Sequence, residues 1–545
     1  YAFVPMGEHK VKNIPEPVTV YRVEPDPGLV AKAIGWKGAG TTKSRWAVGV
    51  LAAAVLALLA AASVTDQFAP WRTILDDTGA MSAGLDPHRI AVLPFANMSQ
   101  DEDNAYFADG ITEELTTRIA QVGRLAVIAR TSIMRYKNTE KSIGEIGREL
   151  SVGTILEGSV RKVGDQVRIT AQLIDVDTEA HLWAKNYDQP LADVFGIQSA
   201  VAQEVAESLK ITLLEGEQER IAKPLTNSVE AHSLYLRAMH VWDHTSDIVR
   251  AVELLEEAID QDPSYAAAHA ALSDLSLSLT NYTNISSEEA GARAAKHAEM
   301  ALALDSELAE AHYAAARVKM AVDWDWDGAE KSFKRALELN PNLIRARIMY
   351  GWRIHLALRR NFDQALREVS GAYERDPLSI DAISAMAWVR YHRREYDAAI
   401  AMARQGLELF PDDPWLYACL GQSQVRKGDH DTGLAEIQRG LELAPDSGFI
   451  LTVLGWSYGM SGQIDKAQEV FTQLEGRAEE DAVSPVILAW TLSGMNEKSR
   501  ALDYLEQAYA QHDNMMIWLR NTDLFDILSE EPRYQALARK MGLEV

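Results

Sequence analysis

The pattern of apolar and polar positions divides the chain into four stretches with different periods. Residues 10–23, KVKNIPEPVTVYRV, alternate apolar and polar positions around a Pro-Glu-Pro turn, which predicts a β-hairpin. Residues 46–64 form a run of nineteen positions without a charge. Short apolar runs then alternate with helical patterns over residues 89–214, and beyond Val229 only helical patterns remain. The chain therefore predicts a hairpin, one long apolar helix, a small α/β domain and an all-α array.

The uncharged run at residues 46–64 is long enough, at helical rise, to cross a hydrocarbon core of about 30 Å. Four basic residues precede it between Lys32 and Arg45, and a basic flank stays in the cytoplasm. We therefore expect a single-pass protein of a bacterial inner membrane, with a cytoplasmic amino-terminal side and with residues 65–545 periplasmic or extracytoplasmic. Two alternatives stay open: a secretory signal sequence, and a buried alanine-rich helix.

Residues 89–214 alternate the patterns of strands and helices. The predicted elements are strands at 89–95 and 125–129, helices at 105–122 and 142–150, a hairpin around Gly164-Asp165, a strand at 181–188 and a helix at 191–214. Ser142 precedes Glu145 by three positions, which predicts a capping box at the start of the second helix. The order β-α-β-α-β-β predicts a small α/β fold.

A recurring stop marks the helices beyond Val229. The motifs AIDQDP, ALELNP, AYERDP, GLELFP and GLELAP end at Pro263, Pro341, Pro377, Pro411 and Pro445. The last three intervals are 36, 34 and 34 residues, a period that indicates stacked helix-turn-helix units. We count about eight units over residues 229–513 and expect capping helices at 514–545 to cover the last apolar face.

The repeating unit resembles the tetratricopeptide repeat. Counting from Gly448, the family's Gly, Tyr, Ala and Phe positions are occupied by Gly455, Tyr458, Ala467 and Phe471. The resemblance implies an α-solenoid whose first helices line a concave wall. It also implies a protein or peptide partner that binds to that wall.

Four tryptophans recur at the same place in the first helix of their units. They are Trp352, Trp388, Trp456 and Trp490, and Gln422 fills that place in the intervening unit. We take the four as candidate partner-binding residues, because tryptophan offers a large contact area at low entropy cost. The alternative is that this position packs against the first helix of the neighbouring unit.

The opening residues resemble the end of a known catalytic domain. The motif G-E-x-x-x-K-N-I-P-E-P-V-x-V-Y-R-V, over residues 7–23, resembles the closing strands of class III adenylate and guanylate cyclase domains. In that family the metal-binding aspartates and the other catalytic residues lie upstream of this motif, so none maps onto this sequence. The resemblance implies that this chain is no enzyme and holds no cofactor, and that its parent is an adenylate cyclase that uses Mg²⁺ and ATP.

The α/β stretch closely resembles the TolB amino-terminal-like domain over residues 89–213, in AVLPFANMS, YFADGITEEL, LAVIARTS and HLWAKNYD. The resemblance implies a binding or assembly role without catalytic residues. The predicted segments are then a cyclase hairpin remnant at 1–23, a basic linker at 24–45, the membrane helix at 46–64, a linker at 65–88, the TolB-like domain at 89–214, the repeats at 229–513 and the capping helices at 514–545.

Charge and cysteine content narrow the possible partners. The chain has 54 basic and 79 acidic residues, a formal charge of −25, and such a surface repels a phosphate backbone. We therefore exclude nucleic acid as a partner. Cys419 is the one cysteine, which excludes an internal disulfide and a zinc site of clustered thiolates. The string Asp175, Asp177 and Glu179 lacks the ligand ring of a calcium loop, and the histidines do not cluster, so we predict no metal site.

These expectations combine into a multidomain α/β plus all-α protein with one transmembrane helix. The predicted function is a membrane-anchored regulatory arm of a class III adenylate cyclase, whose TolB-like and repeat modules bind a protein or peptide in signal transduction. A homodimer is expected, because class III cyclase sites form between two catalytic domains in that family. The alternative is a non-catalytic envelope scaffold or assembly protein.

Overall fold

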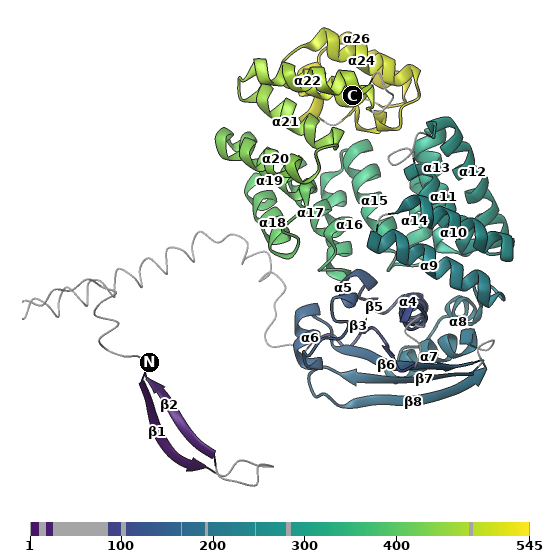
Figure 1. Cartoon of the computed structure of the whole chain (residues 1–545). Coiled ribbons are helices and arrows are strands. Elements are labelled where there is room, and N and C mark those ends of the chain that lie inside the picture. The colour runs from purple at the N-terminus through teal and green to yellow at the C-terminus, as the bar shows by residue number, and fades with distance from the viewer. Residues whose placement is uncertain are drawn as a thin grey trace, which may run out of the picture. The chain divides into compact units, whose positions relative to one another are not determined.

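The protein divides into two compact units, Tyr1–Met81 and Ser82–Val545. The second unit contains a small α/β domain and a long array of paired helices (Figure 1). The computed structural model describes residues 2–9, 18–24, 85–99, 105–164, 166–190, 194–245, 247–279, 285–478, 483–520 and 522–543.

The first unit contains a two-stranded antiparallel sheet. Strand β1 (Ala2–His9) pairs with β2 (Val18–Glu24). The predicted second strand of the hairpin is present, but its partner is β1 and not the predicted stretch at residues 11–14. A strand of 8 residues offers β2 pairing along its whole length, which the four residues before the Pro-Glu-Pro turn do not. Residues 10–17 lie outside the described residues.

The predicted membrane helix at residues 46–64 also lies outside the described residues. Among the helices that the structure describes, none is long and apolar enough to cross a bilayer. The longest of them, α12 (Ser287–Leu304), has 18 residues but carries two glutamates in its first turn, whose charges oppose insertion into lipid. This finding contradicts the expected single-pass inner-membrane localisation, which is therefore wrong.

The α/β domain of the second unit is built on one mixed sheet. Its strands are β3 (Arg89–Val92), β4 (Ala96–Asn97), β5 (Ala126–Val127), β6 (Thr154–Val163), β7 (Gln166–Asp175) and β8 (His181–Pro190). The order is β5-β3-β6-β7-β8, with β4 paired to β6. Strand β3 runs parallel to β5 and β6, whereas β6, β7 and β8 are successively antiparallel. The predicted hairpin and the additional strand at residues 181–188 are both present.

Helices cover both faces of the parallel end of this sheet. They are α4 (Ala105–Ala120), α5 (Arg130–Met134), α6 (Ile143–Leu150), α7 (Val194–Ser208) and α8 (Glu215–Ala222). Successive residues of β3 point to opposite faces, so Ile90 packs with α4 and α7 whereas Ala91 packs with α5 and α6. The capping box predicted at α6 is confirmed, because the Ser142 side chain accepts from the Glu145 amide and Glu145 reaches back to the Ser142 amide.

The array contains eight helix pairs within the described residues, as the sequence period predicts (Figure 1). The first helices are α9 (Val229–Thr245), α11 (Ala266–Ser278), α13 (Ala309–Val318) continued by η4 (Lys319–Asp323), α15 (Ile344–Met349) continued by η5 (Tyr350–Leu358), α17 (Ile380–His392), α19 (Pro414–Lys427), α21 (Gly448–Met460) and α23 (Pro485–Gly494). The second helices are α10 (Ile248–Gln261), α12, α14 (Trp326–Leu339), α16 (Phe362–Arg375), α18 (Tyr396–Leu409), α20 (His430–Leu443), α22 (Ile464–Ala478) and α24 (Lys498–Ala510).

Short polar side chains cap the amino termini of many of these helices. The carboxylate of Asp325 accepts from an amide in the first turn of α14, and Asn361 and Asp413 do the same for α16 and α19. Such caps satisfy amide groups that have no partner inside the helix. Four short elements close the array: η6 (Asn514–Trp518), α25 (Thr522–Phe525), η7 (Asp526–Leu528) and α26 (Pro532–Lys540).

Small residues lie where the two helices of a pair approach most closely. A Cβ added to Gly421 would lie 2.3 Å from the carbonyl oxygen of Gly433, and one added to Gly433 would lie 2.6 Å from that of Gly421. Helices α19 and α20 therefore contact each other backbone to backbone at this point. Ala365, Ala399 and Ala467 are fully buried at the small-residue position predicted for the second helices.

Asn342, between α14 and α15, joins the array to the α/β domain. Its side-chain amide donates to the carbonyls of Ala120 (2.9 Å) and Leu125 (3.0 Å), and its Oδ1 accepts from the Val127 amide (3.4 Å). Arg375 Nε, from the next repeat, also donates to Oδ1 at 3.2 Å. One side chain thus satisfies three backbone groups of the α/β domain.

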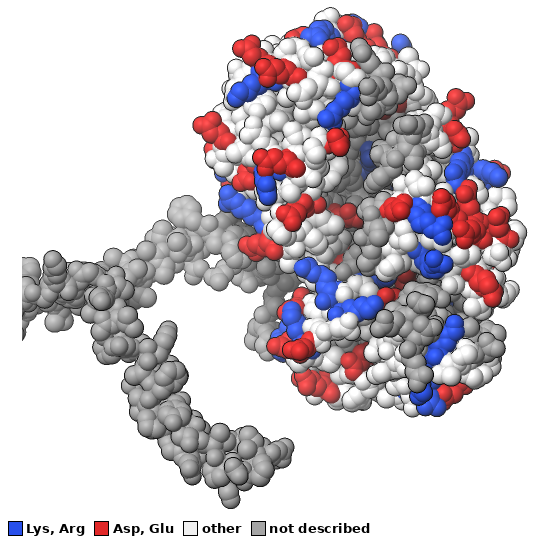
Figure 2. Space-filling view, viewed as in Figure 1, with Lys and Arg blue, Asp and Glu red and all other residues white. Residues whose placement is uncertain are grey.

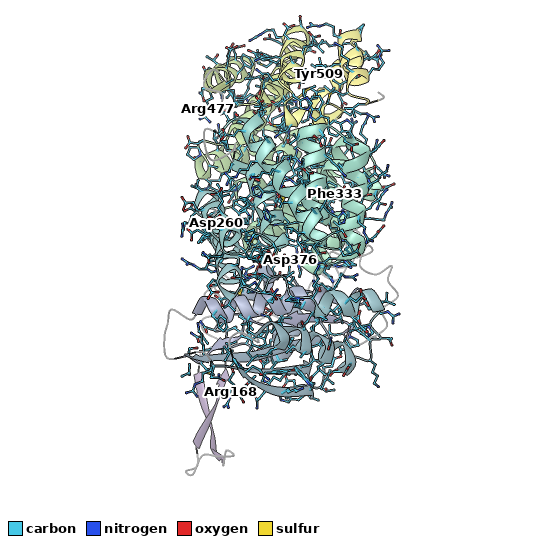
Figure 3. The ribbon with its side chains drawn as sticks, turned by 90° about the vertical axis from the view of Figure 1, so that its right-hand side faces the viewer. Arg168, Asp260, Phe333, Asp376, Arg477 and Tyr509 are labelled. Carbon is cyan, nitrogen blue, oxygen red and sulfur yellow. The ribbon has the colours of Figure 1, made fainter. Side chains whose placement is uncertain are left out.

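A second junction lies one repeat further along. The Ser132 hydroxyl donates to Asp376 Oδ1 and accepts from the Leu378 amide at 3.0 Å. Arg89 Nη2 donates to the carbonyl of Glu374 at 2.7 Å. Figure 3 shows Asp376 where the repeats meet the helices of the α/β domain. These hydrogen bonds connect the two folds of this unit at fixed positions.

Replacing Asn342 by alanine leaves two carbonyls and one amide without partners in a buried junction. We expect the Asn342→Ala variant to lose about 2–3 kcal/mol of unfolding free energy, measured by denaturant titration of the full chain. The control is Arg335→Ala on α14, which removes an exposed ion pair with Glu307 and should cost less than about 1 kcal/mol. Equal losses in the two variants would contradict the role given to Asn342.

Candidate functional site

The first helices of successive repeats pack on one another and form an inner layer of the array. Helix α11 contacts α13, and α17, α19, α21 and α23 contact in succession. The ninth residue from the start of the first helix, counted in α11, α13, α15, α17, α19 and α21, forms an inner-wall column. Its members are Asp274, Arg317, Trp352, Trp388, Gln422 and Trp456, and Trp490 continues it at the predicted spacing of 34 residues.

Three of the four predicted tryptophans are buried. Trp388 is 3 % exposed, Trp456 is 2 % exposed and Trp490 is 4 % exposed, whereas Trp352 is partly buried. Such burial is expected if this position packs against the first helix of the neighbouring unit. Binding of a partner by this row of indoles stays a prediction.

An exposed aromatic side chain lies next to this column and was missed by the sequence analysis. Trp415 is 44 % exposed and stacks on Phe449, with ring centroids 4.4 Å apart. Phe449 in turn contacts Trp388 and Trp490 edge to face, at 5.7 and 5.5 Å. Trp415 and Phe449 both occupy the second position of their helices, a recurrence that the sequence already contained. The pair presents an aromatic surface that solvent can reach.

The carboxyl-terminal elements lie against the column. Trp518 of η6 contacts the rings of Trp352 (6.0 Å) and His392 (6.1 Å). The guanidinium of Arg353 lies 5.6 Å from the centre of the Trp518 ring. Further along, the Trp326 indole donates to the carbonyl of Met541 at 3.0 Å. The carboxyl-terminal segment therefore covers part of the wall that the repeats form.

The other end of the column is charged. Arg317 Nη1 donates to Asp274 Oδ1, and Arg345 Nη1 lies 3.4 Å from Asp274 Oδ2. The Tyr313 hydroxyl lies 3.5 Å from Arg317 Nη1, and burial together with Asp274 raises the pKa of this phenol, which stays protonated. The inner wall thus changes from charged to aromatic along the array.

A small cavity lies between α4 of the α/β domain and α9 of the first repeat. Its volume is about 140 Å³, and its lining includes Asp109, Glu113, Arg130, Arg237 and His240. Arg130 lies 3.6 Å from Glu113 and 3.4 Å from the His240 ring. A small-molecule site usually needs roughly 300 Å³ or more, so this cavity has the size of a water-filled gap.

The structure brings two histidines together that the sequence did not pair. The Nδ1 atoms of His269 and His297 are 2.8 Å apart, and the Nε2 atom of His269 lies 3.2 Å from the carbonyl of Pro263. Because a carbonyl only accepts, Nε2 carries the proton of neutral His269, and the Nδ1–H of His297 donates across the pair. Among the described residues, no group of three or more His, Cys, Asp or Glu side chains is placed to hold a metal ion.

The remaining candidates for chemistry have structural partners. Asp175 Oδ1 accepts from the amide and hydroxyl of Thr178 at 2.8 and 2.6 Å, which closes a turn between β7 and β8. Cys419 is fully buried, and burial raises the pKa of its thiol. A buried thiol of this kind is a poor nucleophile.

The buried and exposed tryptophans give a matched pair for mutation. We expect Trp456→Ala to lower the unfolding free energy by about 3–5 kcal/mol, because it empties a well-packed site. Trp415→Ala removes an exposed ring and should cost about 1 kcal/mol or less. Denaturant titration of the two full-length variants measures the difference. A small loss for Trp456→Ala would show that its indole is available to a partner.

The histidine pair makes stability depend on pH. Burial first, and then the neighbouring His269, lowers the pKa of His297 to about 4, below the value near 6.5 expected in the unfolded chain. The unfolded state therefore takes up the proton first, and stability falls as the pH drops from about 6.5 to about 4. Replacing His297 by glutamine should reduce this loss by on the order of 1 kcal/mol after solvent screening.

Melting curves between pH 7 and pH 4 measure this effect. The control is His312→Gln, since His312 occupies the position of His269 in the next repeat and its ring lies 2.9 Å from the Ser306 carbonyl. An identical pH profile for His297→Gln and the unmodified chain would contradict the prediction.

Two parts of the chain match known families. Residues 353–530 match the tetratricopeptide repeat family, and residues 86–194 match the second domain of HilA/YgeH-like transcriptional regulators. The second match falls on the α/β domain, whose resemblance to the TolB amino-terminal-like domain stays a prediction.

Two curated proteins are similar to parts of the chain. "Putative adenylate cyclase 3" of Rhizobium meliloti (strain 1021) is 38 % identical over 238 residues, which cover 43 % of this chain and 40 % of that protein. The transcriptional regulator HilA of Salmonella paratyphi A is 25 % identical over 178 residues, 32 % of this chain and 32 % of that protein. The chain thus spans two fifths or less of these relatives.

Solved structures match the array at low identity. YrrB, a tetratricopeptide repeat protein with an unusual peptide-binding site, is 21 % identical and covers 37 % of this chain and 97 % of its own, with a TM-score of 0.27. A tetratricopeptide repeat protein from Parabacteroides merdae is 15 % identical over 49 % of this chain and 99 % of its own, with a TM-score of 0.36. The family match over residues 353–530 identifies that part of the chain as tetratricopeptide repeats.

Proposed function

We propose that this chain is the non-catalytic, protein-binding arm of a class III adenylate cyclase-type signalling protein. The inner wall of its repeats is the binding surface, and a peptide or a segment of another protein is the ligand. The observation that carries this proposal is the aromatic surface of Trp415 and Phe449 beside the inner-wall column. Partly exposed aromatic rings of this kind are typical anchors for peptides.

The packing beneath Trp415 supports a preformed binding surface. Phe449 is held between Trp415, Trp388 and Trp490, and the last two are buried. Because these contacts already hold the Phe449 ring in place, the ring loses little conformational entropy when a ligand binds to it. Two buried tryptophans of the column, Trp388 and Trp490, therefore act as the base of the site, and Trp415 acts as the part that touches the ligand.

The cyclase part of the proposal rests on sequence similarity. The adenylate cyclase relative is 38 % identical over 238 residues, and the opening residues 7–23 resemble the closing strands of a cyclase domain. The metal-binding aspartates of that family precede this motif, so this chain by itself is expected to form no cyclic AMP from ATP and Mg²⁺. Its contribution to the parent protein would be to bind a partner and to transmit that binding.

The junction at Asn342 and Ser132 supports such transmission within the second unit. Both side chains tie the α/β domain to the repeats by hydrogen bonds to backbone groups or to a carboxylate. A ligand that changes the spacing of α14, α15 and α16 would strain these bonds. Regulation then requires that the ligand binds two arrangements of the array with different affinity.

The binding function can be tested with short fluorescein-labelled peptides of aromatic, acidic, amide and basic composition. We expect at least one class to raise its fluorescence anisotropy with the full chain, and Trp415→Ala to weaken that binding by roughly tenfold or more. The control variant is Arg439→Ala, an exposed residue of the second helix α20 that pairs with Glu442. Binding that is insensitive to Trp415→Ala would argue against this surface, and no binding by any class would argue against the function.

A further inference from the structure

We propose that the free edge of β8 pairs in antiparallel fashion with β8 of a second copy of this chain, with Asn186 of one copy directly opposite Asn186 of the other. This inference goes beyond the proposed function, because β8 belongs to the α/β domain and takes no part in the inner wall of the repeats. The pairing joins the sheets of two copies into one continuous sheet.

Strand β8 is the outermost strand at the antiparallel end of the sheet (Figure 1). It pairs with β7 on one side, and among the described residues no strand pairs with its other side. All of its 10 residues except Trp183 and Tyr187 are exposed to solvent. A free edge of this length, about 33 Å, presents a row of N–H and C=O groups that a further strand can bind. Strand β5, at the opposite end of the sheet, has only 2 residues and offers no comparable edge.

The side chains on one face of β8 are held by helix α7. The Trp183 indole and the Lys185 ammonium group both donate to the carboxylate of Glu204 on α7. The Nζ atom of Lys185 also lies 5.2 Å from the centre of the Tyr187 ring on the same face. A lysine is a common guard of an exposed strand edge, but this one extends towards α7 and therefore leaves the edge open.

The opposite face of β8 carries polar side chains that contact β7. The Oδ1 atom of Asn186 accepts from the Thr170 hydroxyl at 2.8 Å. The carboxylate of Asp188 forms an ion pair with Arg168, which Figure 3 labels, at 2.6 Å. These contacts direct both side chains back towards β7, so neither blocks a strand that approaches the free edge.

The alternation of faces limits the ways in which two copies of β8 can pair. Residues directly opposite each other in an antiparallel pair lie on the same face of the sheet, as they do between β7 and β8. Two registers that satisfy this condition overlap most of the strand: residues 181–189 centred on Lys185, and residues 182–190 centred on Asn186. The first register places two ammonium groups opposite each other, which is unfavourable. The second places two side-chain amides opposite each other, and an amide both donates and accepts hydrogen bonds.

A second copy fits this edge better than a strand of unrelated sequence. In the second register Lys185 lies opposite Tyr187 of the other copy, and Asp188 lies opposite Ala184. These two are the charged residues of the overlap, so no like charges meet. The formal charge of −25 opposes association at long range. On the face shown in Figure 2, however, acidic and basic side chains are interspersed over the outer surface, so close approach there brings no large patch of one sign together.

The test uses two variants of Asn186 with charges of opposite sign. Sedimentation velocity of the full chain at about 1 to 100 μM should show a monomer–dimer equilibrium. Asn186→Lys and Asn186→Asp should each weaken the dimer roughly fivefold, because like charges then lie opposite each other. An equimolar mixture of the two variants should restore the dimer, because opposite charges then meet. The matched control is Ser159→Lys, in the same cross-strand row on β6 but two strands inward, which should leave the dimer unchanged.

A chain that stays monomeric over this range of concentration would overturn the proposal and leave the edge to a strand of a different protein. A mixture that associates no more tightly than either variant alone would overturn the pairing around Asn186. A dimer that Ser159→Lys weakens as much as Asn186→Lys does would do the same, because the charge would then act over the whole face and not at the edge.

A cysteine at the centre of the pairing gives a second readout. Residues directly opposite each other in antiparallel strands have Cα atoms about 4.5–5.5 Å apart, which a disulfide can span. Asn186→Cys should therefore form a disulfide-linked dimer when oxidised glutathione takes up the two thiol hydrogens, whereas Ser159→Cys should not. Cys419 is fully buried and contributes no linkage in either variant. Equal linkage of the two variants on a non-reducing gel, or none in either, would contradict the proposed pairing.

Discussion

Each helix pair of the array leaves one apolar flank uncovered, and only a neighbouring element can bury it. Stacking on that flank is the constraint from which the other features follow. It places the ninth residues of successive first helices in one column, and it requires small residues such as Gly421 and Gly433 where backbones touch. After α24 the described chain covers the last flank with η6, α25, η7 and α26, whose apolar side chains join the core of the repeats.

Much of this architecture could be predicted from sequence because it is periodic. The helix pairs, the capping box at Ser142 and the hairpin around Gly164 all depend on neighbours within about 35 residues. The burial of Trp352 could not be predicted in this way, because it depends on Trp518, which arrives from the far end of the array. The contacts of Asn342 have no local signal either, since its partners lie more than 200 positions earlier.

The charged end of the inner wall was missed because the repeat length changes there. Asp274 and Arg317 are 43 residues apart, whereas the later members of the column are 34 to 36 residues apart, so Asp274 falls outside the period, and Arg317 is not part of a row defined by tryptophan. The π-helical segments η4 and η5 lie in this region. The predicted inner-membrane localisation was wrong for a different reason. It depended on one apolar run, and none of the helices that the structure describes is long and apolar enough to span a membrane.

The hydrogen bond from the Trp326 indole to the Met541 carbonyl joins positions 215 residues apart. An open solenoid can grow from a local nucleus, one unit after another, because every contact is between neighbours. Here the third repeat finishes its packing only after the last turn of the chain has arrived. Packing around Trp326 therefore includes the closure of a very long loop, and contacts between such distant positions form more slowly than contacts between neighbouring repeats.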